Sequence, residues 1–343
     1  MTAASRDVHV LVLVWNGWED ALECLESLLR VEHPRLRVIV CDNASPNGSL
    51  ERIREWAEGR RAAPAASGPL PARAASPVPK PIPFVEYSRE EAERGGAPDA
   101  VDVPLVLVQT GANLGFAGGN NVGLRYLLAS GAEGFVWLLN NDMVVAPDVL
   151  EHLLAAADTT PAVGAVGATI LDYVEPDRVQ EAAGGIVVEW HGMVTRMCES
   201  GRTRETVRAP LARLDYVSGG CLLAPLDVVR RVGLLDERFF LYAEDIEWSL
   251  RMRAAGFALA WAPRALVWHK GGRSAVHGSP LHDYHYVRSS LLLARKLRPR
   301  MLPLALAWSA VRCGLPKLAR GEWRRLDAVW RAGRDAVRIQ EER

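Results

Sequence analysis

The sequence has few cysteines and no pair of them at CxxC spacing. Its five cysteines are scattered over 343 residues, and three lie in apolar runs typical of buried free thiols, which indicates a reducing compartment. The N-terminus lacks the charged and apolar regions of a signal peptide, and no uncharged apolar stretch reaches the roughly 18 residues that a spanning helix needs. We therefore expect a cytoplasmic protein that is neither secreted nor transmembrane.

The sequence also lacks net charge, because Lys+Arg and Asp+Glu both total 41. We accordingly expect no nucleic-acid partner. The charge is unevenly distributed, since residues 295–343 contain 13 Lys+Arg against 5 Asp+Glu and carry a net charge of +8. With 49% hydrophobic and 24% charged residues, the composition is that of an ordinary globular protein of one large or two ordinary domains.

Short apolar runs alternate with amphipathic helical patterns through much of the chain. The runs expected to form strands are residues 8–14, 36–41, 103–109, 135–139 and 162–170. Strands buried on both faces and separated by helices are typical of an α/β fold with a parallel, Rossmann-like sheet. The first helix is expected to follow a cap at Asn16-Gly-Trp-Glu19.

Other stretches depart from this alternation. Residues 61–83 are rich in Ala and Pro without periodicity, so we expect a flexible insertion, within about 61–102, whose deletion costs little stability. Residues 171–213 are broken by glycines and partly alternating, which indicates a small antiparallel portion. Residues 257–261 and 265–268 are predicted to be two further strands.

The run FVWLLNNDMV at residues 135–144 is the most informative stretch. It stops being apolar at Asn140, Asn141 and Asp142, which would lie at the carboxyl end of a buried strand. Ligands of open α/β sheets bind outside such strand ends. An Asx turn leading into a helix at Pro147 explains the same residues equally well.

Other polar groups also follow expected strands. Asp42 follows residues 36–41 and His269 follows residues 265–268, although a lone histidine after a strand is usually a surface residue. The glycines at 115, 118 and 119 do not have GxGxxG spacing and follow the third strand instead of the first. We therefore do not expect a dinucleotide site.

Seven short motifs together resemble a known family. They are Val14-Trp-Asn-Gly17, Cys41-Asp-Asn-Ala-Ser45, Asn113-Leu-Gly-Phe-Ala-Gly-Gly-Asn120, Leu139-Asn-Asn-Asp142, Ser218-Gly-Gly220, Tyr242-Ala-Glu-Asp245 and His269. Their order and spacing resemble those of family 2 glycosyltransferases of GT-A fold, most of all the bacterial rhamnosyltransferase-like branch. The resemblance covers roughly residues 8–274 and implies a catalytic domain at 1–275, followed by a basic helical region at 276–343.

The resemblance implies a divalent cation, Mg²⁺ or Mn²⁺, that neutralises the phosphates of a nucleotide-diphosphate sugar. Asp142 matches the last residue of the family's DxD motif and would bind this metal, and His269 matches an additional ligand. Asn140 replaces the first Asp of the motif, which removes one negative charge, and would face the ribose or a metal-bound water.

The resemblance also assigns donor, acceptor and catalytic roles. Asp42 matches the residue that accepts the N3 proton of a pyrimidine, and Trp15 takes the aromatic place beside the base, unless it is a core tryptophan. The other implied donor contacts are Asn16, Asn113, Gly115, Asn120, Asn140 and Asn141, and the implied acceptor contacts are Ser218, Gly219, Gly220 and Glu244. Asp245 matches the catalytic base, although an acidic residue in the first turn of a helix is also favoured by the helix dipole.

The expected function is the inverting transfer of one sugar from a nucleotide-diphosphate sugar to a saccharide or lipid-linked saccharide, in cell-surface polysaccharide or glycolipid synthesis. dTDP-rhamnose or another dTDP or UDP sugar is the expected donor. The alternative is a non-catalytic nucleotide-sugar or glycan-binding protein of the same fold, and the retention of Asp142, Asp245 and His269 argues against it. A nucleotidyltransferase would need a basic, Gly-rich loop after the first strand, where this chain has Trp15-Asn-Gly-Trp18.

Residues 284–311 interleave apolar and basic side chains. The apolar ones include Leu291, Leu292 and Leu293. Such a segment either lies in a membrane interface, in this case at the inner face of the cell membrane, or packs against the catalytic domain or a second subunit of a homodimer.

Overall fold

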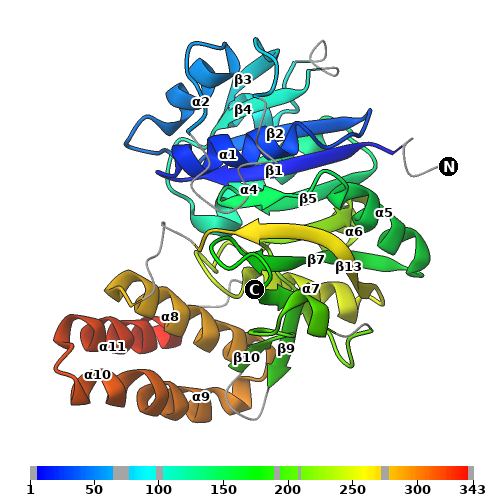
Figure 1. The fold of residues 1–343 in the computed structure, drawn as a ribbon. Helices are drawn as coiled ribbons and strands as arrows, with labels where there is room; N and C mark the ends of the chain where they lie inside the picture. The colour runs from blue at the N-terminus through cyan, green and yellow to red at the C-terminus, as the bar shows by residue number, and fades with distance from the viewer. Residues whose placement is uncertain are drawn as a thin grey trace.

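The computed structural model describes residues 6–64, 77–97, 103–188, 194–207, 210–271 and 278–338. A large central sheet lies between two layers of helices, and the C-terminal helices project from one side of this layered domain (Figure 1). Residues 65–76 and 98–102 of the expected insertion lie outside the described part of the chain. Within the described part, no helix is both long enough and apolar enough to cross a membrane.

Strands and helices largely alternate in the first half of the chain, whereas the second half begins with short strands and ends in helices. The first half contains β1 (Val8–Val14), α1 (Trp18–Leu28), β2 (Leu36–Asp42), α2 (Ser49–Ala57), β3 (Phe84–Ser88), α3 (Arg89–Glu93), β4 (Leu105–Gln109), α4 (Gly115–Ala129), β5 (Phe135–Asn140), β6 (Met143–Val145), α5 (Val149–Thr159) and β7 (Val163–Asp172). The second half contains β8 (Val179–Ala182), β9 (Gly184–Val188), β10 (Val194–Met197), β11 (Tyr216–Val217), β12 (Cys221–Pro225), α6 (Leu226–Val232), α7 (Glu244–Ala254), β13 (Ala258–His269), α8 (Pro280–Leu297), α9 (Leu302–Ser309), a π-helical turn (Ala310–Gly314), α10 (Leu315–Ala319) and α11 (Trp323–Arg338).

The described strands of the central sheet number ten and follow the order β3-β4-β2-β1-β5-β12-β7-β13-β6, with β8 paired to β7. The pairs from β3 to β5 are parallel, and β12 runs antiparallel between β5 and β7. The strand order reverses at β1, which has β2 on one side and β5 on the other. A crevice for a ligand is expected outside the carboxyl ends of strands at such a point.

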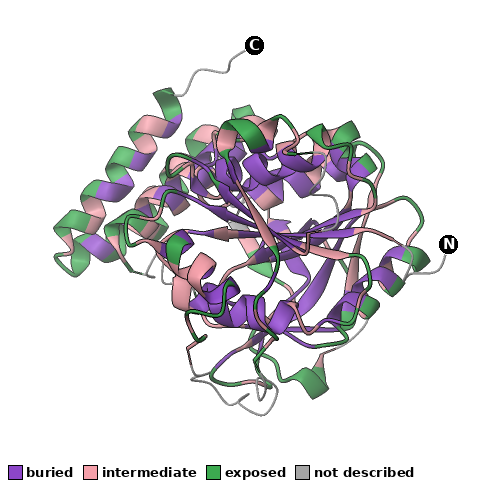
Figure 2. Ribbon diagram, turned by 90° about the horizontal axis from the view of Figure 1, so that it is seen from above, coloured by how far each residue is buried: buried purple, intermediate pink, exposed green. Residues whose placement is uncertain are grey.

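Both faces of the sheet are buried, as the apolar runs predict. In β1, Val10 and Val12 face a core shared with α1, α2 and α5, whereas Leu11 faces a second core shared with α4, α6 and α7. The buried residues accordingly run through the middle of the layered domain (Figure 2). All five cysteines are free, and Cys24, Cys41 and Cys221 are buried as expected.

Two local expectations are wrong. The predicted strands 257–261 and 265–268 form a single strand, β13, whose register against β7 shifts between Ala262 and Leu266. Asn16 does not cap α1, because the cap position is Gly17 and no side chain accepts a hydrogen bond there. Asn16 instead has a positive φ of 60°, which turns the chain after β1. The expected antiparallel portion is confirmed by β9, β10 and β11, which form a separate small sheet.

Part of the Ala- and Pro-rich stretch packs against the domain, which corrects the expectation that all of residues 61–83 is dispensable. Ile82 is buried in the core that also holds Trp56. The Lys80 ammonium and the Val78 backbone N–H donate to the two carboxylate oxygens of buried Glu26, at 3.0 and 2.8 Å. This anchored segment leads into β3, which forms the edge of the central sheet beside β4.

We expect Ile82→Ala to lower the free energy of unfolding by about 2 to 5 kcal/mol, because it leaves a cavity in the core. Pro79→Ala is the matched control, since Pro79 is exposed, and it should change stability by no more than about 1 kcal/mol. Urea unfolding of both variants measures the difference. Equal stabilities would show that residues 78–82 do not contribute to folding.

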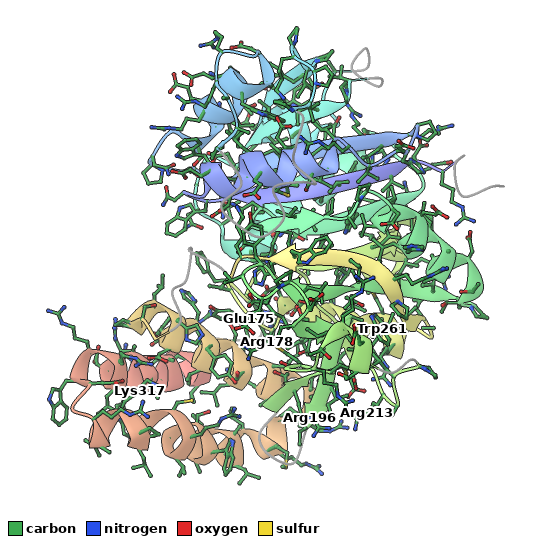
Figure 3. The ribbon with its side chains drawn as sticks, viewed as in Figure 1. Glu175, Arg178, Arg196, Arg213, Trp261 and Lys317 are labelled. Atoms are coloured by element: carbon green, nitrogen blue, oxygen red, sulfur yellow. The ribbon has the colours of Figure 1, made fainter. Side chains whose placement is uncertain are left out.

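The C-terminal helices pack on one another and, through α8, on the layered domain near the start of α7. Leu291, Leu292 and Leu293 of α8 are buried in a third core that also contains Val329 of α11. For these three leucines, packing is therefore confirmed and exposure to a membrane is wrong. Lys317 of α10, labelled in Figure 3, is itself buried and lies 3.2 Å from the carboxylate of Asp283 on α8.

Candidate active site

A cavity of about 510 Å³ opens at the carboxyl ends of β1, β5 and β13, where the sheet order predicts a ligand crevice. Seven of the residues predicted from the sequence line it: Trp15, Asn113, Gly115, Asn140, Asn141, Asp142 and His269. The other eight lie around it without lining it: Asn16, Asp42, Asn120, Ser218, Gly219, Gly220, Glu244 and Asp245. The fold thus brings together residues that are up to about 250 positions apart in the chain.

Asp142 and His269 form a pair on the wall of the cavity. The His269 Nε2 atom lies 3.2 Å from an Asp142 carboxylate oxygen. Burial disfavours the imidazolium form, but the hydrogen bond and charge of Asp142 outweigh burial and raise the pKa of His269. The backbone N–H of Lys270 also donates to the Asp142 carbonyl at 3.1 Å, which ties the end of β13 to the end of β5.

Gln180 determines which nitrogen of His269 faces the cavity. The Gln180 amide nitrogen donates to Asp172 at 3.0 Å and to the His269 carbonyl at 3.3 Å, so its oxygen is left to face His269 Nδ1, at 2.7 Å. Nδ1 therefore carries a hydrogen and donates it to Gln180, so Nε2 donates to Asp142 in the imidazolium form and offers a lone pair in the neutral form. An imidazole oriented by an outer hydrogen bond in this way is typical of metal-binding histidines.

Lys270 holds this wall against the first helix. Its ammonium forms ion pairs with Asp20, at 2.8 Å, and with Glu23 of α1. The Tyr173 hydroxyl also donates to Glu23, at 2.5 Å. The side chains of Lys270, Asp20 and Glu23 are all at least partly buried. Their ion pairs tie the end of β13, which carries His269, to α1.

Asp42 lies next to the cavity, beside the end of β1, and offers an unused acceptor. Its Oδ2 accepts the Ser45 backbone N–H at 3.1 Å, whereas its buried Oδ1 has no hydrogen-bond partner in the described structure. Burial raises the pKa of Asp42. Trp15 is half-buried beside it on the cavity wall, so the alternative of a fully buried core tryptophan is not what the structure shows.

The loop before α4 is shaped by Asn43, a cavity residue that the sequence analysis did not single out. The Asn43 amide donates to the Asn113 side chain at 3.0 Å and to the Gly115 carbonyl at 3.1 Å, while its oxygen accepts the Leu114 N–H at 3.0 Å. Gly115 has a φ of 71°, and a Cβ there would lie 2.1 Å from the Phe240 carbonyl oxygen. Only glycine fits this close approach.

Asn120 has a different environment from the other predicted donor contacts. It is buried within α4, and its amide donates to the Phe116 carbonyl at 2.9 Å. The asparagine therefore supports the loop from behind, at a position that does not line the cavity.

Asp245 lies in the first turn of α7, as the alternative based on the helix dipole also predicted. Its two carboxylate oxygens accept the backbone N–H groups of Gly219 and Ile246, both at 2.8 Å. Burial raises the pKa of Asp245 in spite of these bonds. The turn before it is strained, because Tyr242 and Ala243 both have positive φ, at 69° and 68°.

Glu244, the neighbour of Asp245, is buried in a less polar environment. Its Oε2 has no hydrogen-bond partner among the described residues. Burial and the nearby charge of Asp245 raise the pKa of Glu244 well above its usual range, which favours the protonated form of this carboxyl. The pair therefore contains one carboxyl that is well hydrogen-bonded and one that is not.

The predicted acceptor residues connect Asp245 to β12. The Gly220 carbonyl accepts the Asn140 backbone N–H at 3.0 Å, which fixes the start of β12 beside the end of β5. A Cβ on Gly219 would lie 3.2 Å from both the Asp245 Cβ and the ring of Phe116, which lines the cavity. Because Gly219 has no Cβ, Asp245 can pack close to Phe116 of the cavity wall.

Glu181 of β8 is a carboxylate near the site that the sequence did not reveal. Burial raises its pKa, while a hydrogen bond with Ser218 lowers it, and the charges of Asp245 and His269 both act on it. It therefore lies among these three residues. Nothing in its local sequence distinguishes it from a solvent-facing residue of an alternating strand.

A second group that the sequence did not reveal forms an aromatic wall. Phe240 and Tyr242 line the cavity together with Leu281 and His285 of α8. The ring of His285 stacks on Phe240 with centroids 4.9 Å apart. Burial lowers the pKa of His285 to about 4, so it is a neutral ring at pH 7. The first turns of α8 thus contribute to the cavity, although they lie within the residues 276–343 expected to be a separate region.

Comparisons with known proteins agree with this geometry. A family model described as "Glycosyltransferase like family 2" matches residues 93–280, and one described as "Glycosyl transferase family 2" matches residues 9–63. The N-acetylglucosaminyl-diphospho-decaprenol L-rhamnosyltransferase of Mycobacterium tuberculosis is 31% identical in an alignment of 200 residues that covers 53% of this chain and 65% of that protein. The dTDP-rhamnosyl transferase RfbF of Shigella flexneri is 26% identical over 55% of this chain and 63% of its own length.

Solved structures share the fold. The mannosyltransferase PcManGT from Pyrobaculum calidifontis, solved with GDP-Man and Mn²⁺, has a TM-score of 0.52 at 18% identity, over 98% of this chain and 88% of its own. GalNAc-T7, solved with UDP, GalNAc and Mn²⁺, has a TM-score of 0.52 at 13% identity, over 83% and 47%. The predicted GT-A fold, a mostly parallel sheet flanked by helices with a small antiparallel portion, is confirmed. The chain spans less than two thirds of the length of each of the two rhamnosyltransferases. Because a family model matches more than half of its residues, the chain belongs to glycosyltransferase family 2.

Proposed function

We propose that this protein is an inverting, metal-dependent glycosyltransferase that moves one sugar from a nucleotide-diphosphate sugar to a hydroxyl of a saccharide acceptor. The observation that carries the proposal is that one cavity is lined by both Trp15 and the Asp142–His269 pair, with the half-buried Asp245 next to Gly219 and Phe116 at its wall. An aromatic side chain and an unused carboxylate oxygen suit a nucleobase. The acid–imidazole pair suits a diphosphate with its cation.

The residues of the pair fit a divalent cation. Asp142 offers an oxygen and His269 offers the Nε2 lone pair that Gln180 orients. No third His, Cys, Asp or Glu joins them into a cluster in the described ranges, so diphosphate oxygens and water would complete the coordination. A nitrogen ligand favours Mn²⁺ over the harder Mg²⁺. When bound, the cation neutralises charge that develops on the departing diphosphate.

Asp245 is the proposed general base. As the acceptor oxygen bonds to the anomeric carbon, the bond from that carbon to the diphosphate oxygen breaks and the hydroxyl proton passes to the Asp245 carboxylate. The Gly219 and Ile246 N–H groups hold both carboxylate oxygens in place, and each oxygen retains a second lone pair for the proton. Attack from the side opposite the leaving group inverts the anomeric configuration.

The names of the relatives support a finer proposal for the substrates. Both named rhamnosyltransferases transfer rhamnose, and one carries dTDP in its name, so we propose dTDP-rhamnose or another dTDP or UDP sugar as donor. The mycobacterial relative is named for a lipid-linked saccharide, which makes the same class the proposed acceptor, in polysaccharide or glycolipid synthesis. A peripheral position at the inner face of the cell membrane is part of this proposal, since such an acceptor resides in a membrane.

A transfer assay tests the proposal. The full chain is incubated with Mn²⁺, a panel of dTDP, UDP and GDP sugars, and a synthetic N-acetylglucosaminyl diphospho-polyprenol, and the anomeric configuration of the product is read by NMR. A product of configuration opposite to the donor supports the proposal. Retention of configuration would contradict inversion, and donor binding without turnover on saccharide or lipid-linked acceptors would favour the non-catalytic nucleotide-sugar-binding alternative.

We expect Asp42→Asn to weaken dTDP and UDP binding about tenfold. The carboxylate can accept both the Ser45 N–H and a pyrimidine N3–H, whereas an amide has one acceptor and would leave one donor unpaired. Calorimetric titration with Mn²⁺ present measures the effect, and GDP, which lacks a pyrimidine, is the control ligand. Equal losses for GDP would show that the substitution disturbs the loop instead of base recognition.

A further inference from the structure

The exposed apolar side chains of this protein are concentrated at its C-terminus. Eleven large apolar side chains are exposed in the described ranges, and eight of them belong to residues 302–338. These eight are Leu304, Trp308, Val311, Leu315, Leu318, Trp323, Trp330 and Val337. We call residues 298–338, which include α9, α10 and α11, the C-terminal lobe. The lobe projects from the layered domain, and exposed residues cover much of its helices (Figures 1 and 2).

Five of these eight side chains line one groove of about 810 Å³ between α9–α10 and α11: Val311, Leu315, Leu318, Trp330 and Val337. The buried side chains Val287 and Leu291 of α8 also line it. Contiguous exposed apolar surface of this kind marks an interaction site. The groove is larger than the candidate active-site cavity and is separate from it, since the two share no lining residue.

The surroundings of the groove are strongly basic. Eight arginines of the lobe are exposed: Arg298, Arg300, Arg312, Arg320, Arg324, Arg331, Arg334 and Arg338. Asp327 is the one exposed carboxylate among residues 298–338, and it pairs with Arg331 at 2.8 Å. Residues 295–343 carry a net charge of +8 in a chain whose overall charge is zero.

We propose that the C-terminal lobe binds the surface of an anionic lipid membrane, with the apolar rim of the groove inserted among the acyl chains and the arginines at the level of the phosphates. Anionic lipid neutralises the positive charge of the lobe, whereas a second copy of this lobe would bring a like charge against it. Trp308, Trp323 and Trp330 suit the boundary between water and hydrocarbon, where tryptophan is enriched. The lobe lies on the membrane, because no described helix can cross it.

This surface overlaps only in part with residues 284–311, the segment that the sequence suggested. Leu291, Leu292 and Leu293 are buried, whereas Leu304 and Trp308 of that segment are exposed. The other lipid contacts come from residues further along, such as Leu315 and Leu318. Membrane binding by the lobe does not depend on the proposed transfer reaction. It would, however, place the cavity near the leaflet, because α8 lines the cavity with its first turns and the groove with its later ones.

Vesicle flotation tests the proposal with the full chain. Wild-type protein is mixed with vesicles of phosphatidylglycerol and phosphatidylcholine, or of phosphatidylcholine alone, at low and high salt. We expect flotation with the anionic vesicles, reduced by high salt. The double variant Leu315→Glu/Leu318→Glu should lower the bound fraction at least about tenfold, because both side chains are exposed at the groove.

A matched control separates the groove from exposed apolar residues in general. Val174→Glu/Met197→Glu places the same two charges at exposed apolar positions outside the lobe and should float as the wild type does. Thermal melting shows that each variant is folded. No flotation of the wild type, or equal flotation of the double variant, would overturn the proposal. A dimer seen by light scattering that the double variant abolishes, without vesicle binding, would overturn it in favour of a second copy.

Discussion

Asp245→Asn should lower kcat by about 10² or more while donor binding stays nearly unchanged. Asparagine keeps the shape of the side chain, and its oxygen can still accept one of the N–H groups of Gly219 and Ile246. It cannot take a proton from the acceptor hydroxyl. Steady-state kinetics with a saturating donor measure the loss, and calorimetric titration of the donor shows that the nucleotide site is intact.

The pH profile adds a second readout for Asp245. A base must be deprotonated, and burial raises the pKa of this carboxyl, so activity should fall on the acid side at a pH above the usual aspartate range. Glu244→Gln is the matched control, because it makes the same change from carboxyl to amide at the neighbouring position, where burial favours the uncharged form. Near-normal turnover of Asp245→Asn with loss in Glu244→Gln would move the base to Glu244. Activity in both variants would contradict a base at this turn.

Asp142→Asn should weaken donor binding in the presence of Mn²⁺ by roughly 10²-fold and leave the weak metal-free binding unchanged. Outer partners of metal ligands alone contribute 10- to 100-fold to metal affinity, and the loss of a charged ligand should cost no less. Titration of the donor with and without Mn²⁺ measures this difference. His269→Ala should act in the same direction, because it removes the other half of the 3.2 Å pair.

Asp148→Asn serves as the control for the metal prediction. Asp148 precedes α5, does not line the cavity and has an exposed side chain, so the same chemical change there should leave metal-dependent binding intact. If Asp142→Asn bound the donor as tightly as the wild type with Mn²⁺, the assignment of the cation to this pair would be contradicted.

The sequence predicts the strand-end chemistry well because the polar residues interrupt apolar runs. Asn140 to Asp142 and His269 follow strands in the sequence, and a parallel sheet brings the ends of such strands together. The order of the strands cannot be predicted in the same way. β12 enters between β5 and β7 and thereby places Gly219 beside Asp245 and Gly220 beside Asn140, which depends on the tertiary fold alone.

Other features depend on contacts that have no local signature. Gln180 orients His269 from β8, 89 positions away, and Glu26 holds the Ala- and Pro-rich stretch through Val78 and Lys80. An Ala- and Pro-rich composition predicts disorder, but a buried carboxylate elsewhere in the chain supplies the partners that order residues 78–80.

The C-terminal helices show where apolar periodicity is ambiguous. Leu291, Leu292 and Leu293 read equally well as a core face or a lipid face, and the structure buries all three against α11. Exposed apolar side chains lie later in the same segment, at Leu304 and Trp308, and further along, at positions such as Leu315 and Trp330. Which face is left uncovered depends on how α9, α10 and α11 pack, and a hydrophobic pattern does not encode this.

The proposal that the cavity binds a nucleotide-sugar donor with a divalent cation is tested most directly by a thermal-shift panel. The wild type is melted with dTDP, UDP and GDP, and with their sugars, in the presence and absence of Mn²⁺. We expect dTDP or UDP compounds to raise the melting temperature only with Mn²⁺, and Asp142→Asn to abolish that increase. If no nucleoside diphosphate or nucleotide sugar stabilised the wild type in a metal-dependent way, the central claim would be contradicted.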